Sequence, residues 1–189
     1  MFARTPRLTL RPGWAEDAPA LAAAIAHESV VSKLARAPWP YGLSDAEYFL
    51  AIERGARDVA CLIFAHEGAP QPRLVGCIGI HPTDDGEHEI GYWLTPDAWG
   101  RGYATEAGRA MLGIARHALG LRRLVSGHFT DNPASGRVLR KLGFAPTGQI
   151  VRRESRARAV AAPHANYALD LTGADDERPA MPPALRLAA

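Results

Sequence analysis

The segment from residue 87 to residue 119 constrains the fold more than any other part of the chain. Residues 87–94 include isoleucine, tyrosine and tryptophan, side chains typical of a strand, and a proline follows this run. Residues 102–119 place apolar side chains at steps of three and four, which predicts a long helix. Two closely spaced glycines, Gly100 and Gly102, lie in the bend between them. The chain must therefore fold around a strand, a tight bend and a helix.

Other parts of the chain alternate between the same two patterns. Further strands are predicted at residues 8–11, 59–66, 74–81, 121–127, from 144 onward and at 166–171. Further helices are predicted at residues 16–27, 29–35, 44–54 and 132–142, and a loop at 159–163. Ser44 and Glu47 have the spacing of a capping box, so Ser44 is expected to cap the third of these helices. Residues 1–172 are predicted to form a single domain, and residues 173–189 have the composition of a flexible tail.

Composition narrows the class of protein. Apolar residues make up 47% of the chain, which is enough for a core. The net charge is only +2 and the arginines are scattered, which argues against a nucleic-acid binder. No apolar stretch approaches the ~18 residues of a membrane-spanning helix, and residues 1–12 lack the apolar core of a signal peptide. We therefore expect a cytoplasmic enzyme or binding module without a membrane partner.

The cysteines and histidines do not follow the pattern of a metal or redox site. Cys61 and Cys77 each lie inside an apolar run without a C-x-x-C spacing, and we expect both to be buried. The seven histidines are scattered and show no metal-ligand spacing. We therefore predict that the chain holds no metal.

The bend at residues 99–104 is the strongest local signal for a ligand. Glycines allow a backbone to approach a ligand closely, and the first amides of the following helix have no partner within the helix. With the helix dipole, these amides form an anion site that suits a pyrophosphate. The alternative is that the two glycines only allow a tight turn and bind no ligand. The third glycine of a dinucleotide fingerprint is missing at Thr105, and no Gly-Lys-Ser/Thr of a P-loop follows.

Two longer blocks carry a resemblance to a known family. Residues 88–107 resemble the acetyl-CoA-binding motif of the GNAT superfamily of N-acetyltransferases. Residues 132–144, Asn-Pro-Ala-Ser-Gly-Arg-Val-Leu-Arg-Lys-Leu-Gly-Phe, look like the second half of that cofactor site. Residues 7–12 and Trp99, where many members carry Gln or Arg, are similar to the RimJ/RimL branch, which acetylates protein N-termini and related amines. The resemblance covers roughly residues 7–171.

The resemblance implies an α/β (α+β) fold with a mixed, mostly antiparallel sheet of about seven strands and helices on both faces. The sheet is expected to splay between residues 89–94 and 124–127, with the pantetheine arm of acetyl-CoA lying between the two strands. Backbone groups near residues 93–95 would bond the pantetheine, residues 100–104 would hold the pyrophosphate, and Asn132 would bond the arm from the other side. The residues implied to bind the cofactor are Trp93, Leu94, Thr95, Gly100, Arg101, Gly102, Tyr103, Ala104 and Asn132.

Two residues are candidates for proton transfer. An amine must lose a proton before it attacks a thioester, and Glu89 is the candidate general base, acting directly or through a water. The alternative is that Glu89 only pairs with a neighbouring strand or positions the substrate. Ser135 is the candidate acid for the leaving thiolate, because it lies one helical turn after Asn132. The alternative is that Asn132 or Ser135 simply caps a helix, and Pro133 after Asn132 favours Asn132 as the cap.

The acceptor is less constrained than the cofactor. Trp39 and Tyr41, in a proline-rich loop, are the candidate substrate contacts, while Tyr48, Tyr92 and Trp93 could equally be core. A protein N-terminal amine is the first hypothesis for the acceptor, and a polyamine, amino sugar or amino acid is the second. A non-catalytic acyl-CoA-binding sensor on the same fold is the third. Dimers are common among similar proteins, so a homodimer is compatible with the resemblance.

Overall fold

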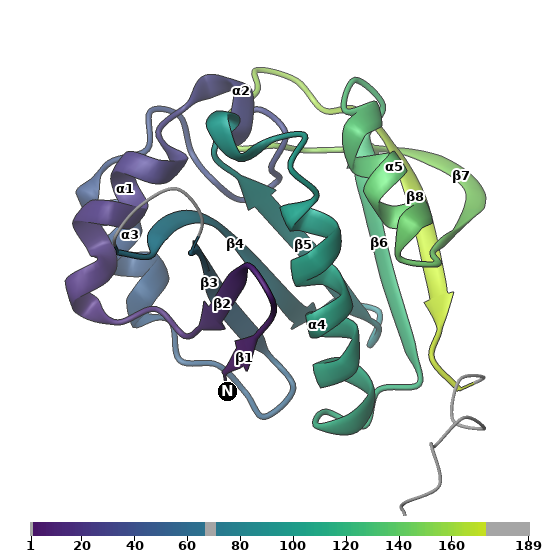
Figure 1. Cartoon of the computed structure of the whole chain (residues 1–189). Helices are drawn as coiled ribbons and strands as arrows, with labels where there is room; N and C mark the ends of the chain where they lie inside the picture. Colours follow the sequence, from purple (N-terminus) through teal and green to yellow (C-terminus); the bar gives the residue numbers. More distant parts are fainter. Residues whose placement is uncertain (1, 67–70, 173–189) are drawn as a thin grey trace, which may run out of the picture.

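The computed structural model describes residues 2–66 and 71–172, which form one sheet with helices on both faces (Figure 1). The sheet has eight strands in the order β1-β2-β3-β4-β5-β6-β8-β7. The strands are β1 (Ala3–Arg4), β2 (Leu8–Arg11), β3 (Val59–Ala65), β4 (Arg73–Pro82), β5 (His88–Leu94), β6 (Arg123–Phe129), β7 (Ala145–Arg153) and β8 (Ala162–Asp170). The helices are η1 (Ala15–Asp17), α1 (Ala18–Ile25), α2 (Glu28–Val31), α3 (Leu43–Ala51), η2 (Pro96–Ala98), α4 (Tyr103–His117) and α5 (Pro133–Lys141). The predicted tail at residues 173–189 lies outside the described residues.

The sheet is antiparallel everywhere except between β5 and β6. β4 and β5 pair along their length, from Gly76 opposite Leu94 to Pro82 opposite His88. The parallel strands β5 and β6 share a single pair, Glu89 opposite Val125. Beyond that pair the two strands separate, so the predicted splay is present in the middle of the sheet.

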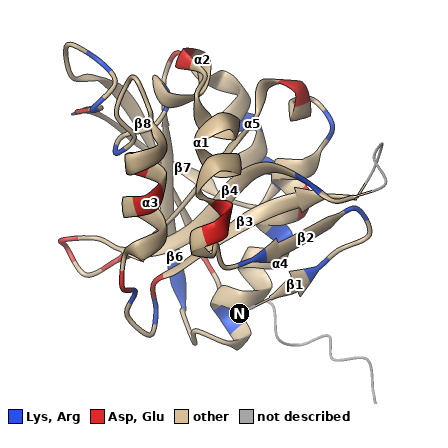
Figure 2. Ribbon diagram, turned by 90° about the vertical axis from the view of Figure 1, so that its left-hand side faces the viewer, with Lys and Arg blue, Asp and Glu red and all other residues tan. Residues whose placement is uncertain are grey.

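Each face of the sheet is covered by its own set of helices. On one face, the α4 side chains Tyr103 and Met111 are buried in one cluster with strand residues that include Ile80 and Ile90. On the other face, α1 and α3 pack on β3 and β4, with Leu21 among the buried residues. Figure 2 shows basic and acidic positions intermixed over the ribbon seen from that side. The predicted mixed sheet with helices on both faces is confirmed.

The ends of several elements differ from the sequence prediction. The sheet has one strand more than expected, because β1 contributes only two residues, Ala3 and Arg4, which are too few to show alternation. β8 begins inside the predicted loop at residues 159–163, since Pro163 needs no amide partner and its carbonyl accepts the Thr130 N–H at 2.9 Å.

Two helix predictions are wrong in detail. Gly42, rather than Ser44, precedes α3, and the Asp45 carboxylate accepts the Gly42 N–H at 2.9 Å, so Glu47 has no capping role. α2 ends at Val31 rather than at residue 35. The chain leaves the helix there because the next carbonyls bond to a distant loop between β7 and β8.

Cys61 and Cys77 are both free and buried, as expected from their apolar runs. Burial raises the pKa of the Cys77 thiol to about 12, so it stays protonated. Over residues 2–66 and 71–172, no helix has the length and apolar character needed to cross a bilayer. Over the same residues, the His, Cys, Asp and Glu side chains form no group suited to hold a metal ion.

Candidate active site

A cavity of about 1190 Å³ lies where β5 and β6 separate. Its lining comes from both faces of the sheet, including the start of α4 and residues along α5 on one face and the segment after α2 on the other. Ser126 Oγ donates to the Ile90 carbonyl at 2.8 Å, which joins the two strands at the closed end of the gap. A ligand in this cavity can therefore reach from one face of the sheet to the other.

The bend before α4 has the backbone geometry expected of an anion site. Gly100 and Gly102 have φ values of 73° and 81°, in the region that favours glycine, and both line the cavity. The first helical bond of α4 runs from Glu106 N–H to the Gly102 carbonyl at 3.0 Å. The preceding amides of the first turn therefore have no partner within the helix. Tyr103 is fully buried and anchors this turn in the core.

Arg101, which is predicted to bind the cofactor, has its side chain against Tyr103 in this structure. Its guanidinium lies over the Tyr103 ring, 5.5 Å from the centroid, and its carbonyl accepts Arg7 Nη1 at 2.9 Å. It is absent from the residues that line the cavity in the described chain. The positive charges that do line this side are Arg137 and Lys141 of α5, which the sequence reading did not select.

The backbone of β5 offers one edge to the gap. Thr95 N–H donates to the Val75 carbonyl of β4 at 2.8 Å, and the indole of Trp99 donates to the Leu94 carbonyl at 2.9 Å. Because successive residues of a strand direct their backbone groups to opposite sides, Trp93 faces β4 as Thr95 does. The groups that face the gap belong to Leu94 and Tyr92. Of the predicted backbone donors in β5, only Leu94 is on the side of the gap.

Asn132 and Ser135 lie together at the start of α5, as their spacing predicts. Asn132 is the N-cap, and its Oδ1 accepts the Ser135 N–H at 3.4 Å. Ser135 Oγ lies 2.9 Å from the hydroxyl of Tyr92 on β5. Burial raises the Tyr92 pKa to about 12, although the bond to Ser135 opposes the shift. Tyr92 therefore remains a protonated phenol beside Ser135, a contact that spans the gap between β5 and α5.

Glu89 is held by side chains from two other strands. Arg153 of β7 donates from Nη1 to Oε1 at 2.7 Å and from Nη2 to Oε2 at 2.8 Å. His81 Nε2, on β4, lies 3.4 Å from Oε2. Burial raises the Glu89 pKa, but the contacts with His81 and Arg153 outweigh it and hold the net pKa well below its usual range. A carboxylate with so low a pKa is a weak direct base, and its charge faces the His81 ring.

His164 of β8 supports this ion pair. The ring is buried, its Nδ1 lies 3.0 Å from Asn166 Oδ1, and its Nε2 lies 3.5 Å from Arg153 Nη1. With Nδ1–H donating to the amide oxygen, Nε2 is left to accept from Arg153. Burial lowers the pKa of His164, which favours the neutral ring that this arrangement needs.

Two glycines lie beside Glu89 in the wall of the cavity. Gly79 and Gly91 are partners in the ladder of β4 and β5, next to the pair of His81 and Glu89 and on the same face. A Cβ at Gly91 would meet no heavy atom within 4 Å, whereas one at Gly79 would lie 2.7 Å from the Val59 carbonyl. Both glycines line the cavity. The absence of a side chain at Gly91 thus leaves space inside the site.

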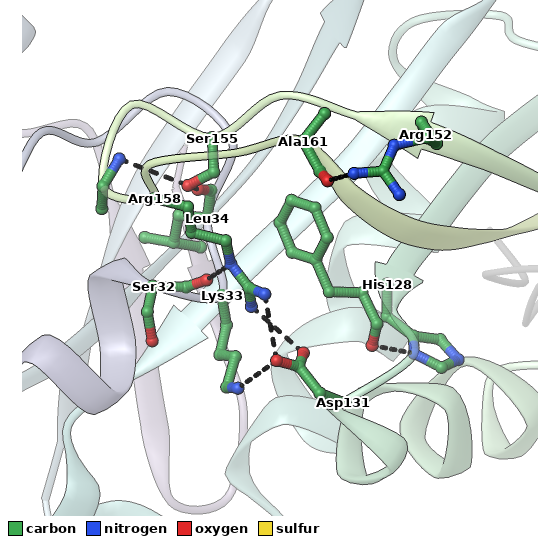
Figure 3. A network of polar contacts seen from close by, with 11 residues as sticks. Ser32, Lys33, Leu34, His128, Asp131, Arg152, Ser155, Arg158 and Ala161 are labelled. Atoms are coloured by element: carbon green, nitrogen blue, oxygen red, sulfur yellow. Dashed lines mark hydrogen bonds and ion pairs between the residues drawn. The ribbon is translucent and has the colours of Figure 1, made fainter.

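The wall of the cavity on the side of α2 is tied together by polar contacts (Figure 3). Lys33 and Arg158 converge on the carboxylate of Asp131, each at 3.0 Å. Ser155 Oγ donates to the Leu34 carbonyl at 2.6 Å. The segments after α2, after β6 and between β7 and β8 are therefore held as one unit, although they are far apart in the sequence.

The two predicted acceptor contacts are placed differently. Tyr41 lines the cavity, and burial, with Asp45 nearby, raises its pKa to about 12. Trp39 is 42% exposed and is not among the lining residues, so its predicted role has less support. The proline-rich loop still reaches the cavity through Pro38.

Sequence reasoning missed His81, Arg153 and His164. One signal was available for His81, since the turn around Gly86 pairs it with Glu89 across a hairpin. Arg153 and His164 had no such signal, because β7 and β8 meet Glu89 only through the sheet order.

The comparisons with known proteins agree on one family. Residues 7–145 match the family described as the acetyltransferase (GNAT) domain. The uncharacterized N-acetyltransferase YoaA of Bacillus subtilis (strain 168) is 32% identical over 158 residues, covering 77% of this chain and 84% of that relative.

Solved structures show the same fold. An acetyltransferase of the GNAT family from Bacillus anthracis has a TM-score of 0.75 at 23% identity, over 90% of this chain and 99% of that one. RimL, a ribosomal L7/L12 alpha-N-protein acetyltransferase in complex with coenzyme A, has a TM-score of 0.72 at 19% identity, over 90% of this chain and 98% of that one. At these identities the two structures establish the fold alone.

Proposed function

This chain belongs to the GNAT acetyltransferase family, and we propose that, within it, the chain acetylates a protein N-terminal amine by direct attack in a ternary complex. The coarser activity follows from the family: the chain is an N-acetyltransferase that uses acetyl-CoA. The acceptor and the roles of individual residues are the proposal. The observation that carries it is a single cavity that connects an amide-rich helix start on one face with Glu89 on the other.

The residues on the α4 side fit acetyl-CoA. Gly100 and Gly102 turn the backbone so that the first amides of α4 face the cavity, and anions bind favourably at such a helix start. Arg137 and Lys141 would add positive charge opposite these amides. Leu94 and Tyr92 would pair with the pantetheine arm along β5, and Asn132 would approach it from α5. When bound, acetyl-CoA supplies the thioester that the amine attacks.

Ser135 is proposed as the acid. When the bond between the acetyl carbon and sulfur breaks, the thiolate would take a proton from Ser135 Oγ. Tyr92 would replace that proton, because its hydroxyl lies 2.9 Å away and its raised pKa keeps it protonated. A thiolate also leaves without help, so the contribution of Ser135 is expected to be smaller than that of the base.

Glu89 is proposed to act through His81. A protein α-amine has a pKa of about 8 and must reach the thioester unprotonated. Imidazole is the side chain most used to accept such a proton near neutral pH, and His81 lines the cavity. Glu89, kept ionised by Arg153, would stabilise the imidazolium that forms. In this arrangement the low pKa of Glu89 keeps its carboxylate charged, as the role requires. The same low pKa would hinder Glu89 if it had to accept the proton itself.

The charges around the cavity favour an acceptor with a single amine. A polyamine or aminoglycoside needs several free carboxylates to hold its ammonium groups. The carboxylates in the lining are Asp45, Asp58 and Glu89, and of these Asp45 is bonded to the Gly42 amide and Glu89 to Arg153. The cations in the lining are Lys33, Arg36, Arg54, Arg137, Lys141, Arg153 and Arg156.

The same excess of cations over free carboxylates is compatible with a second candidate acceptor, a small molecule with one amine such as an amino acid. RimL, which shares the fold, is named as an acetyltransferase of the α-amine of a ribosomal protein, and this supports a protein N-terminal amine as the acceptor.

We also propose a cytoplasmic location, to which the free, buried Cys61 and Cys77 are suited.

Release of CoA thiol from acetyl-CoA tests the proposal. The protein would be offered peptides with a free N-terminus, the same peptides with a blocked N-terminus, spermidine, an aminoglycoside and free amino acids. We expect release of CoA thiol with the peptides that have a free N-terminus, and only background release with the blocked peptides. Faster release with a free amino acid would favour the second candidate. Background release with every peptide would rule out the N-terminal acceptor.

A further inference from the structure

Two arginines from distant parts of the chain meet at the acceptor side of the cavity. Arg36 follows α2 and Arg156 lies between β7 and β8, and both line the cavity. The Arg156 N–H donates to the Ala35 carbonyl at 3.0 Å, and the neighbouring Ser155 hydroxyl donates to the Leu34 carbonyl at 2.6 Å. These bonds hold the two segments side by side, so both arginines lie on the same wall of the cavity. We call this pair the arginine rim.

Two carboxylates of this part of the molecule, Asp131 and Glu89, are already paired with cations. Asp131 accepts from both Lys33 and Arg158, and Glu89 is held by Arg153 through two bonds. In residues 2–66 and 71–172, neither arginine of the rim forms an ion pair, and both are exposed. The rim therefore presents positive charge to whatever enters the cavity from this side.

The rim is separate from the part of the cavity that suits the cofactor phosphates. The amides of α4 and the cations of α5 lie with the core cluster on one face of the sheet. The segment after α2, which carries Arg36, belongs to the other face with α1 and α3. A negative group bound at the rim must therefore belong to the acceptor.

We propose that the acceptor carries a carboxylate close to its reacting amine, and that Arg36 and Arg156 bind that carboxylate. The inference rests on the proposed function and narrows the class of acceptor to amines that also carry a carboxylate. A guanidinium matches a carboxylate with two parallel N–H donors, so arginine suits this task better than lysine. The carboxylate can come from an acidic residue at a peptide N-terminus or from a free amino acid.

Matched acceptors that differ only in charge test the inference. The probes are the tripeptide amides Glu-Ala-Ala and Gln-Ala-Ala, with free glutamate and its diamide as the small-molecule arm. We expect kcat/KM to be about tenfold higher for each acidic probe than for its neutral match, since two exposed ion pairs contribute up to about a factor of ten together. The preference should appear in KM and shrink as salt is raised.

Two double variants test whether Arg36 and Arg156 cause the preference for acidic acceptors. R36Q/R156Q should bring the ratio close to one, because kcat/KM for the acidic peptide should fall by more than kcat/KM for the neutral peptide. R57Q/R109Q removes the same charge from exposed positions outside the cavity and should keep the ratio. Melting temperatures of both variants check that each folds.

The outcomes separate this inference from the proposed function. Equal kcat/KM for acidic and neutral probes would overturn the inference and leave the N-acetyltransferase intact. A preference that survives in R36Q/R156Q would overturn the rim as its source. An acidic preference in the peptide arm or in the amino-acid arm supports it, and identifies the source of the carboxylate. Background turnover of all four probes would overturn both the inference and the N-terminal acceptor.

Discussion

The two halves of the active site are built in different ways. In the proposed cofactor half, the candidate contacts lie in two short segments, the bend before α4 and the start of α5, and those of the bend are backbone amides. The proposed acceptor half would use side chains from β4, β5, β7 and β8, with Glu89, His81 and Arg153 at its centre. Backbone amides are present whatever the side chain, so the cofactor half should tolerate most substitutions that keep its shape. The acceptor half should fail when one functional group changes.

The largest effect is expected from Glu89→Gln. The amide keeps the shape of the side chain but removes the charge that would stabilise His81 as it accepts a proton. Turnover should fall about 100-fold, the lower range for a lost general base system, while acetyl-CoA affinity stays unchanged. Steady-state kinetics and calorimetry measure the two quantities. His81→Gln serves as the partner variant and should lose a similar factor.

Normal turnover in Glu89→Gln across pH would remove Glu89 from the chemistry and leave it as a structural ion pair. Normal turnover in His81→Gln alone would instead favour proton transfer through a water.

A smaller effect is expected on the free energy of unfolding. The pKa of Glu89 is lowered in the folded state, so its contribution to stability is present above the unfolded pKa of about 4.3 and is lost as pH falls below it. Glu89→Gln should therefore be less stable than the native chain by about 2 kcal/mol near pH 7, because Arg153 loses its charged partner. The difference should shrink progressively as pH falls below about 5, through the range where the folded-state carboxylate takes up its proton. Urea unfolding at several pH values measures it, and a difference independent of pH would contradict the ion pair.

The comparison of the two halves also explains what the sequence could predict. The strand, bend and helix from residue 88 onward, and Asn132 as the cap of α5, depend on local propensity and glycine conformation, which are visible in the sequence. The partners of Glu89 depend on the order of strands in the sheet, and β8 lies between β6 and β7. No local pattern encodes that order, so Arg153 could not be paired with Glu89 beforehand. The guanidinium of Arg101 lies over the Tyr103 ring, an orientation that its place beside the bend does not predict, and its contact with the pyrophosphate stays a prediction.

Gly102→Val tests the cofactor half, where conformation rather than chemistry should matter. A β-branched residue at φ 81° is strained by about 1–3 kcal/mol, and the bend would move to relieve it. Acetyl-CoA affinity measured by calorimetry should fall about tenfold. Gly113→Ala is the control, because it lies later in α4, outside the cavity lining, in open space. Unchanged affinity in Gly102→Val would mean that the bend does not hold the phosphates.

The smallest effect is expected from Gly91→Ala, which adds one methyl group to the cavity wall in the acceptor half. A Cβ there meets no atom of the protein within 4 Å, so the melting temperature should stay the same. The methyl group would take up part of the space available to the acceptor, and the acceptor KM should rise about threefold, which corresponds to about 0.6 kcal/mol of binding free energy. Acetyl-CoA affinity should not change. Gly79→Ala is the contrasting variant, since its Cβ would press on the Val59 carbonyl and lower stability without reporting on the acceptor. If Gly91→Ala weakened acetyl-CoA instead, the acceptor and the cofactor would share this wall, and the division between the two halves would have to be redrawn.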